Sequence, residues 1–169
     1  EQICPIGDEA GATVDGGFAE FVLVPHRRHV VPLGELDPLQ ATPFGCAALC
    51  AYAAVKRVRP HLPGGTALVI IGIGGLGQYG VQFARALTGA TIIAVDMRNE
   101  QLARGLALGA DHALPSGPDV RESIHELTGG RGAAAVIDFV GTNESLALAA
   151  DVVAARGLVA LLGLAGGTV

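Results

Sequence analysis

A glycine-rich run, Gly72-Ile73-Gly74-Gly75-Leu76-Gly77, constrains the fold of this chain more than any other feature. The uninterrupted apolar run at 67–71 precedes it and is typical of a fully buried strand, and residues 78–87 have the pattern of a helix. Asp96 then ends a second apolar run, at 91–95. A buried strand, a glycine turn, a helix and a second strand ending in an acidic residue together predict a nucleotide-binding βαβ unit.

The residues of this unit each have a physical role in binding a dinucleotide. Gly72 allows the tight turn, Gly74 lets a pyrophosphate approach the backbone without meeting a Cβ, and Gly77 lets the helix pack closely on the sheet. The start of the helix adds unpaired N–H groups and the positive end of its dipole. Asp96 can accept hydrogen bonds from both adenosine ribose hydroxyls and would repel a 2′-phosphate. This favours NAD over NADP, although Arg98 could stack on the adenine or bind a 2′-phosphate.

Composition and charge narrow the class of protein. Half of the 169 residues are apolar, and no apolar run approaches the ~18 residues of a membrane span, so we expect one compact soluble domain without membrane segments. The net charge is −5 and no basic cluster exceeds Arg27-Arg28, which argues against nucleic acid as a partner. Three cysteines argue against a secreted disulfide scaffold and favour a reducing cytoplasm. The first residues lack both an initiator Met and a signal-peptide pattern, so we expect a piece of a longer protein.

The rest of the chain extends an alternation of strands and helices. Residues 18–24 alternate loosely before Pro25 and predict a strand. Asp37-Pro38 predicts a short helix that Pro43 ends or interrupts. The further strands are expected at 67–71, 91–95, 112–114, 134–139 and 158–162, and the further helices at 47–57, 78–87, 101–108, 120–128 and 144–154. Because near-continuous apolar strands need cover on both faces, the predicted fold is α/β, a Rossmann-type doubly wound parallel sheet with helices on both faces.

Several sequence motifs along the chain are similar to those of one protein family. They are GIGGLGQYGVQ at 72–82, AVD at 94–96, LGADH at 108–112, DGGFAEF at 15–21, AAVKR at 53–57 and VIDFVG at 136–141. Together they resemble the zinc-dependent medium-chain alcohol dehydrogenase family, whose members carry a GroES-like catalytic domain and a Rossmann domain. The resemblance covers essentially the whole chain and the middle half of the family's usual length. It implies that residues 1–45 are a remnant of the β-rich catalytic domain and that residues 46–169 are the Rossmann domain, incomplete at its C-terminal end.

The resemblance also implies which residues bind NAD. In the family, one loop beside the adenine and one beside the nicotinamide carboxamide join the glycine turn and the acidic residue. The implied cofactor-binding residues are Gly72, Gly74, Gly75, Leu76, Gly77, Asp96, Val140, Gly141, Leu162, Gly163 and Leu164. The two loops follow the carboxyl ends of strands, where doubly wound sheets bind ligands.

Two cysteines correspond to zinc ligands of the family. Cys46 aligns with the third protein ligand of the catalytic zinc, and Cys4 resembles the last cysteine of the structural zinc lobe. A catalytic zinc needs three protein ligands, so with Cys46 alone we expect no bound zinc and no complete catalytic site in this chain. Cys50 stands where the family has Thr. Two interpretations of Cys50 are open. It is a small buried apolar residue, or it forms a soft-metal site together with Cys46, which lies one helical turn away.

These implications give one expected function and two alternatives. We expect the cofactor-binding core of an NAD-dependent, zinc-containing alcohol dehydrogenase, which transfers a hydride between NAD and a small alcohol, aldehyde or ketone. The chain alone should show no turnover. The alternatives are a zinc-free oxidoreductase like the quinone reductases and a nucleotide-binding or assembly module without chemistry. We expect a homo-oligomer for the full-length protein, and an exposed apolar sheet edge at strand 158–162.

Overall fold

The computed structural model describes residues 7–168, and the chain divides into two compact units after Gln40. The first unit carries a 3₁₀ turn, η1 (Arg27–His29). The prediction of a strand at 18–24 is wrong, because this segment is irregular and its apolar side chains, such as Phe18, are exposed. A strand depends on hydrogen bonds to a neighbouring strand, and none of the described residues forms a ladder with this segment.

Two short helical elements follow. α1 (Pro38–Ala41) begins after Asp37, whose side chain accepts a hydrogen bond from the Gln40 N–H at 2.9 Å. Pro43 lies in the next element, a 3₁₀ turn η2 (Thr42–Gly45), because it has no N–H to continue an α-helical ladder. The expected start at Asp37-Pro38 and the interruption at Pro43 are both confirmed.

The small-residue helix is confirmed as α2 (Ala47–Val58), which a further 3₁₀ turn, η3 (Arg59–His61), continues. Its buried face includes Ala51 and Val55, which are fully inaccessible to solvent. Small side chains on this face let α2 pack closely against α3 (Gly77–Leu87).

The second unit is built on five parallel strands in the order β3-β2-β1-β4-β5. The strands are β1 (Ala67–Ile71), β2 (Thr91–Asp96), β3 (His112–Pro115), β4 (Ala133–Asp138) and β5 (Val153–Leu161). The helices that connect them are α3, α4 (Asn99–Ala107), α5 (Val120–Leu127) and α6 (Asn143–Val152). This confirms the doubly wound parallel sheet, and the expected boundaries hold to within two residues except at the start of β5.

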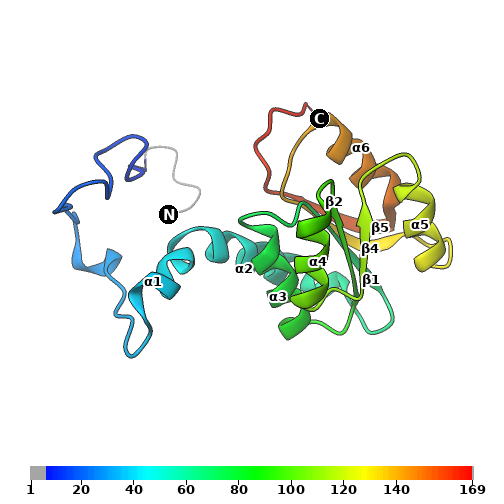
Figure 1. Ribbon diagram of the computed structural model, residues 1–169, viewed down its shortest axis with the longest axis horizontal. Helices are drawn as coiled ribbons and strands as arrows, with labels where there is room; N and C mark the ends of the chain where they lie inside the picture. Colours follow the sequence, from blue (N-terminus) through cyan, green and yellow to red (C-terminus); the bar gives the residue numbers. More distant parts are fainter. Residues whose placement is uncertain (1–6, 169) are drawn as a thin grey trace. The chain divides into compact units, whose positions relative to one another are not determined.

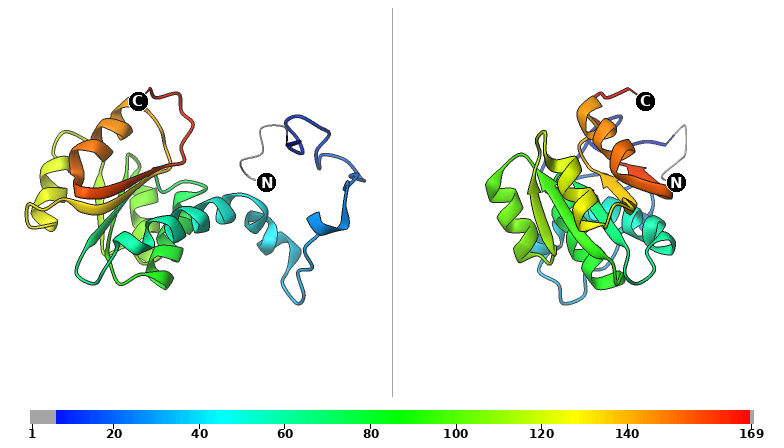
Figure 2. Two further views of the ribbon diagram at one scale, coloured as in Figure 1. Left: turned by 180° about the vertical axis from the view of Figure 1, so that it is seen from behind. Right: turned by 90° about the vertical axis from the view of Figure 1, so that its right-hand side faces the viewer.

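Helices cover both faces of the sheet (Figure 1, Figure 2). Alternate residues of β1 point to opposite faces, so Leu68 and Ile70 belong to the core under α2 and α3. Val69 and Ile71 belong to a second core under α5 and α6. Because all five residues of β1 are buried, the run reads as continuously apolar in the sequence rather than alternating.

The last strand lies at the edge of the sheet, as expected. β5 pairs only with β4 among the described strands, and Val159 and Leu161 on it are 37% and 46% exposed. β5 begins at Val153, earlier than the predicted start at 158. The register against β4 shifts between Ala133 and Ala135, and this irregularity lengthens the strand. Arg156 lies in this irregular stretch with a φ of 66°.

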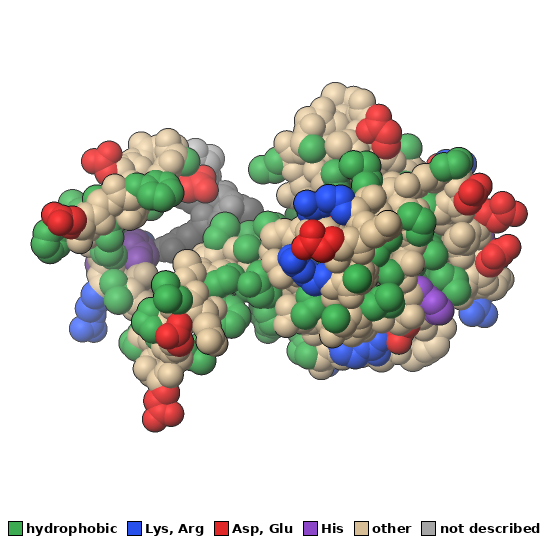
Figure 3. Space-filling model, viewed as in Figure 1, with side chains coloured by type: hydrophobic (Ala, Val, Ile, Leu, Met, Phe, Trp, Pro, Cys, Tyr) green, Lys and Arg blue, Asp and Glu red, His purple; other side chains and the backbone are tan. Residues whose placement is uncertain are grey.

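No helix among residues 7–168 is long and apolar enough to cross a membrane. On the face drawn in Figure 3, basic, acidic and apolar side chains are interspersed.

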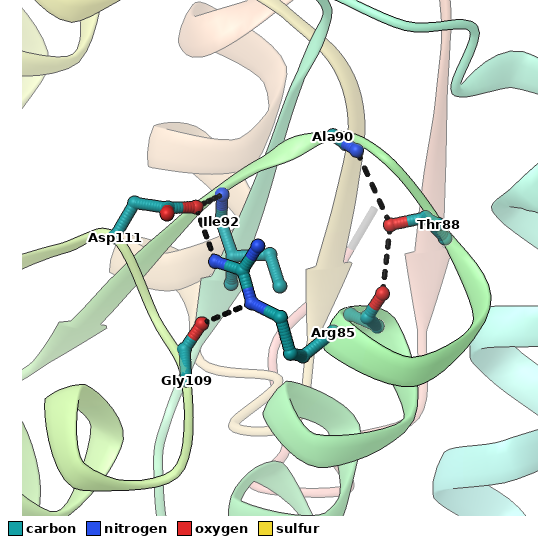
Figure 4. Close-up of polar contacts among 7 residues, drawn as sticks. Arg85, Thr88, Ala90, Ile92, Gly109 and Asp111 are labelled. Atoms are coloured by element: carbon teal, nitrogen blue, oxygen red, sulfur yellow. Dashed lines mark hydrogen bonds and ion pairs between the residues drawn. The ribbon is translucent and has the colours of Figure 1, made fainter.

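At the amino-terminal end of the strands, an ionic network ties α3 to β2 and to the segment before β3 (Figure 4). The Arg85 guanidinium bonds the Asp111 carboxylate at 2.6 Å and the Gly109 carbonyl at 2.8 Å. Asp111 also accepts a hydrogen bond from the Ile92 N–H at 2.8 Å. Burial acts to raise the pKa of Asp111, but the Ile92 N–H, the Arg85 guanidinium and the nearby His112 outweigh it and hold the pKa below its ordinary value.

Asp111→Asn should therefore lower the free energy of unfolding near neutral pH by about 1 kcal/mol, a modest value because both side chains are over a third exposed. Since the folded pKa lies below the unfolded one, this stabilisation is present above about pH 4 and is lost as the pH falls through the folded pKa. Urea unfolding at several pH values measures both effects. Glu100→Gln, which removes an exposed pair with Arg104, is the control, and equal losses in the two variants would contradict the prediction.

Candidate dinucleotide-binding site

Two glycines of the run are required by the turn itself. Gly72 has a φ of +84°, and a Cβ there would lie 2.6 Å from Cγ2 of Val140. A Cβ on Gly77 would lie 1.8 Å from the carbonyl oxygen of Gly72, a backbone atom that cannot rotate away. The turn therefore closes on itself through these two positions, and α3 begins at Gly77 immediately after it.

The middle of the run is open. A Cβ on Gly74 or Gly75 would meet no atom within 4 Å. Within residues 7–168, the N–H groups of Gly74, Gly75 and Leu76 donate to no other protein group. Leu76 is the N-cap of α3 and provides no side-chain cap. Open space, free donors and the positive end of an 11-residue helix dipole together suit the phosphates of a dinucleotide.

Asp96 links the glycine turn to the end of β2. Its Oδ2 accepts a hydrogen bond from the Ile73 N–H at 2.8 Å, and its Oδ1 accepts one from the Arg98 N–H at 2.9 Å. Two carboxylate oxygens have about four lone-pair sites, so each oxygen can accept a further bond. Asp96 therefore orients both loops and still has acceptor capacity for a ligand hydroxyl.

A cavity of 880 Å³ lies at the carboxyl ends of the strands, within the size range of small-molecule sites. The ends of β1 and β2, the loops after β2, β3 and β4, and the first turns of α5 and α6 form it. Of the predicted residues, Gly72, Asp96 and Val140 line this cavity. This is the edge at which doubly wound sheets bind ligands.

The loops after β4 and β5 pack backbone against backbone. A Cβ on Gly141, which has a φ of +76°, would lie 2.3 Å from the Gly163 carbonyl oxygen, and one on Gly163 would lie 2.0 Å from the Val140 carbonyl carbon. The Leu162 N–H bonds the Asp138 carbonyl at 2.8 Å, while Leu164 is fully exposed. Gly141 and Gly163 thus have a structural role, and none of the residues from Gly141 to Leu164 predicted for the cofactor lines the cavity.

A buried carboxylate without a predicted role, Asp138, organises the turn after β4. Asp138 is fully buried and accepts hydrogen bonds from the N–H groups of Val140 (2.8 Å) and Gly141 (3.1 Å). The Ser145 hydroxyl donates to its other oxygen at 2.7 Å. Thr142 and Ser145 form a capping box that starts α6, and both line the cavity. Asp138 therefore positions one wall of the site.

The two described cysteines lie one turn apart at the start of α2. Cys46 is the exposed N-cap and Cys50 is partly buried. Burial and the neighbouring Cys46 side chain raise the pKa of the Cys50 thiol. No three His, Cys, Asp or Glu side chains within residues 7–168 gather as a metal site would require, and Cys4 lies outside those residues. The residues that the structure describes therefore do not by themselves form a zinc site.

Comparison with known sequences identifies the family of the chain. The family described as zinc-binding dehydrogenase matches residues 75–169. The chain belongs to this family. This confirms the resemblance to the zinc-dependent medium-chain alcohol dehydrogenase family that was inferred from the glycine run and the motifs around it.

Relatives of the chain include two curated proteins and a solved structure. An NAD-dependent alcohol dehydrogenase of Sulfurisphaera tokodaii is 38% identical and is matched over 98% of this chain and 48% of its own length. A D-arabinose 1-dehydrogenase (NADP(+)) of Saccharolobus solfataricus is 34% identical, over 92% and 45%. The crystal structure of an alcohol dehydrogenase from Aeropyrum pernix matches with a TM-score of 0.93 and 33% identity, over 99% of this chain and 49% of that one. The chain spans about half the length of these relatives.

Proposed function

We propose that this chain is the NAD-binding part of an alcohol dehydrogenase that acts on a small alcohol or its carbonyl counterpart. The observation that carries the proposal is the 880 Å³ cavity at the carboxyl ends of the strands, next to a glycine turn with free N–H groups. Alcohol dehydrogenase relatives at 38% and 33% identity support the same reaction class. NAD, when bound, would accept or donate the hydride at its nicotinamide.

The chain's own residues bind and orient the cofactor in this proposal. The N–H groups of Gly74, Gly75 and Leu76 bind the pyrophosphate, and the Asp96 carboxylate accepts from the ribose hydroxyls. In this proposal the loop at Val140 would border the adenine, and the loop of Leu162, Gly163 and Leu164 would border the nicotinamide carboxamide. Gly141 packs against Gly163 and so holds these two loops together.

The remaining expectations are proposals about the full-length protein. Cys46 is proposed as a ligand of its catalytic zinc and Cys4 as a ligand of a structural zinc, with the domains divided as 1–45 and 46–169. The free thiols of Cys46 and Cys50 suit a reducing cytoplasm. The exposed edge of β5 suits a homo-oligomer.

Asp96 sets the preference between NAD and NADP in this proposal, because an ionised carboxylate repels a 2′-phosphate. Calorimetric titration should find that the chain binds both nucleotides, NAD more tightly, and that Asp96→Ala reduces NAD affinity by about tenfold and removes the preference. Asp111→Asn is the matched control, since that carboxylate also accepts a backbone N–H but lies at the opposite end of β2. Absence of binding, or tighter binding of NADP by the unmodified chain, would overturn the proposal.

A further inference from the structure

A buried amide connects the glycine turn to an arginine at the cavity. Gln101 on α4 is only 6% exposed. In the amide orientation that satisfies both neighbours, its nitrogen donates to the Ile73 carbonyl at 2.8 Å and its oxygen accepts from the Arg98 guanidinium at 2.8 Å. Asp96 bonds the N–H groups of the same two residues. Gln101 and Asp96 thus hold Ile73 and Arg98 from two sides.

The Arg98 guanidinium differs from the other guanidinium at the cavity. Arg121 forms a salt bridge with Asp151, which offsets its charge. Arg98 lines the same cavity beside Asp96, but within residues 7–168 no carboxylate lies in salt-bridge distance of its guanidinium. Its partner is a neutral amide, which fixes the side chain and leaves its charge and most of its five N–H donors available.

We propose that Gln101 is a positioning residue for cofactor selection: it holds the Arg98 guanidinium at the ribose end of the cavity, where Arg98 binds the 2′-phosphate of NADP. This inference rests on the proposed function. Asp96 disfavours the phosphate and Arg98 partly offsets that repulsion, so the site binds NAD preferentially and NADP as a second cofactor. A long arginine side chain loses rotamer freedom on binding an anion, and an amide that already holds it reduces that loss.

Calorimetric titrations with NAD and NADP test the proposal, because the two ligands differ only in the 2′-phosphate. Arg98→Leu should raise the Kd for NADP about tenfold and that for NAD less than about twofold. Gln101→Met, which keeps the side-chain shape, should weaken NADP about fivefold when Arg98 is present and have no selective effect when Arg98 is Leu. This dependence on Arg98 separates positioning from a general structural role. Gln101→Glu is the second variant, since its charge would offset the guanidinium and should also weaken NADP selectively.

Each outcome decides the matter. If the unmodified chain binds neither nucleotide, the proposed function fails and this inference fails with it. If it binds both and Arg98→Leu weakens them equally, the guanidinium stacks on the shared part of the cofactor and only this inference is overturned. If the Gln101→Met effect persists in the Arg98→Leu background, Gln101 does not act through Arg98 and the positioning role is overturned.

Discussion

Gly77→Ala should destabilise the second unit by about 3 kcal/mol or more. The added Cβ would lie 1.8 Å from the carbonyl oxygen of Gly72 and 2.8 Å from its carbonyl carbon. These are backbone atoms, and Gly72 is itself held by a hydrogen bond from its N–H to the Val95 carbonyl at 2.8 Å. To relieve the overlap, the turn must move away from β2. The first turn of α3 is then lost as well.

Urea unfolding followed by circular dichroism measures this loss. Gly75→Ala is the matched control two residues away, where a Cβ meets nothing within 4 Å, and its free energy of unfolding should change by less than about 1 kcal/mol. A Gly77→Ala protein as stable as the Gly75→Ala protein would show that the turn is not closed in the way described.

Gly74→Ala should have the opposite profile, a loss of NAD affinity of about tenfold or more with little change in stability. A Cβ at Gly74 enters open space, so the folded chain accommodates it. The same methyl group would occupy the approach to the free N–H groups of Gly75 and Leu76. A phosphate would then lose its close contact with the backbone.

Calorimetry with NAD and urea unfolding of the same preparations distinguish the two profiles. Gly89→Ala is the control, because its Cβ is also in open space but lies in the connection between α3 and β2, at the other end of the sheet. NAD binding by Gly74→Ala with unchanged affinity would mean that the pyrophosphate does not approach the turn at this position.

The sequence predicted the sheet and its helices because their signals are local. Buried parallel strands such as β1 and β2 are uninterrupted apolar runs bounded by glycine or charge, and the helices between them have their own period. The strand expected at 18–24 failed because its pattern is local but its stability depends on a partner strand. The predicted β5 is too short, because the register shift against β4 has no signature in the residues of β5.

The site could be predicted only in part. The glycine turn and Asp96 have fixed spacings that follow from their roles. Asp138 and Gln101 are polar residues that become buried only on folding. The fold pairs Asp138 with Ser145, and it pairs Gln101 with Ile73 and Arg98. A signal for Gln101 was available: it lies four positions before Gly105, whose Cβ would approach Ala94 at 3.2 Å, so both lie on the buried face of α4. For Asp138 the available signal was its position at the end of an apolar strand, which it shares with Asp96.

The most direct test of the central claim is a two-dimensional ¹H–¹⁵N NMR titration of the chain with NAD. The account predicts that the largest shifts occur at the amides of Gly74, Gly75 and Leu76, with further shifts at Asp96 and Val140 around the cavity. The amides of Ile92 and Asp111, at the other end of the sheet, should remain unchanged. An unchanged spectrum, or shifts confined to residues away from the carboxyl ends of the strands, would contradict the assignment of this edge as a dinucleotide site.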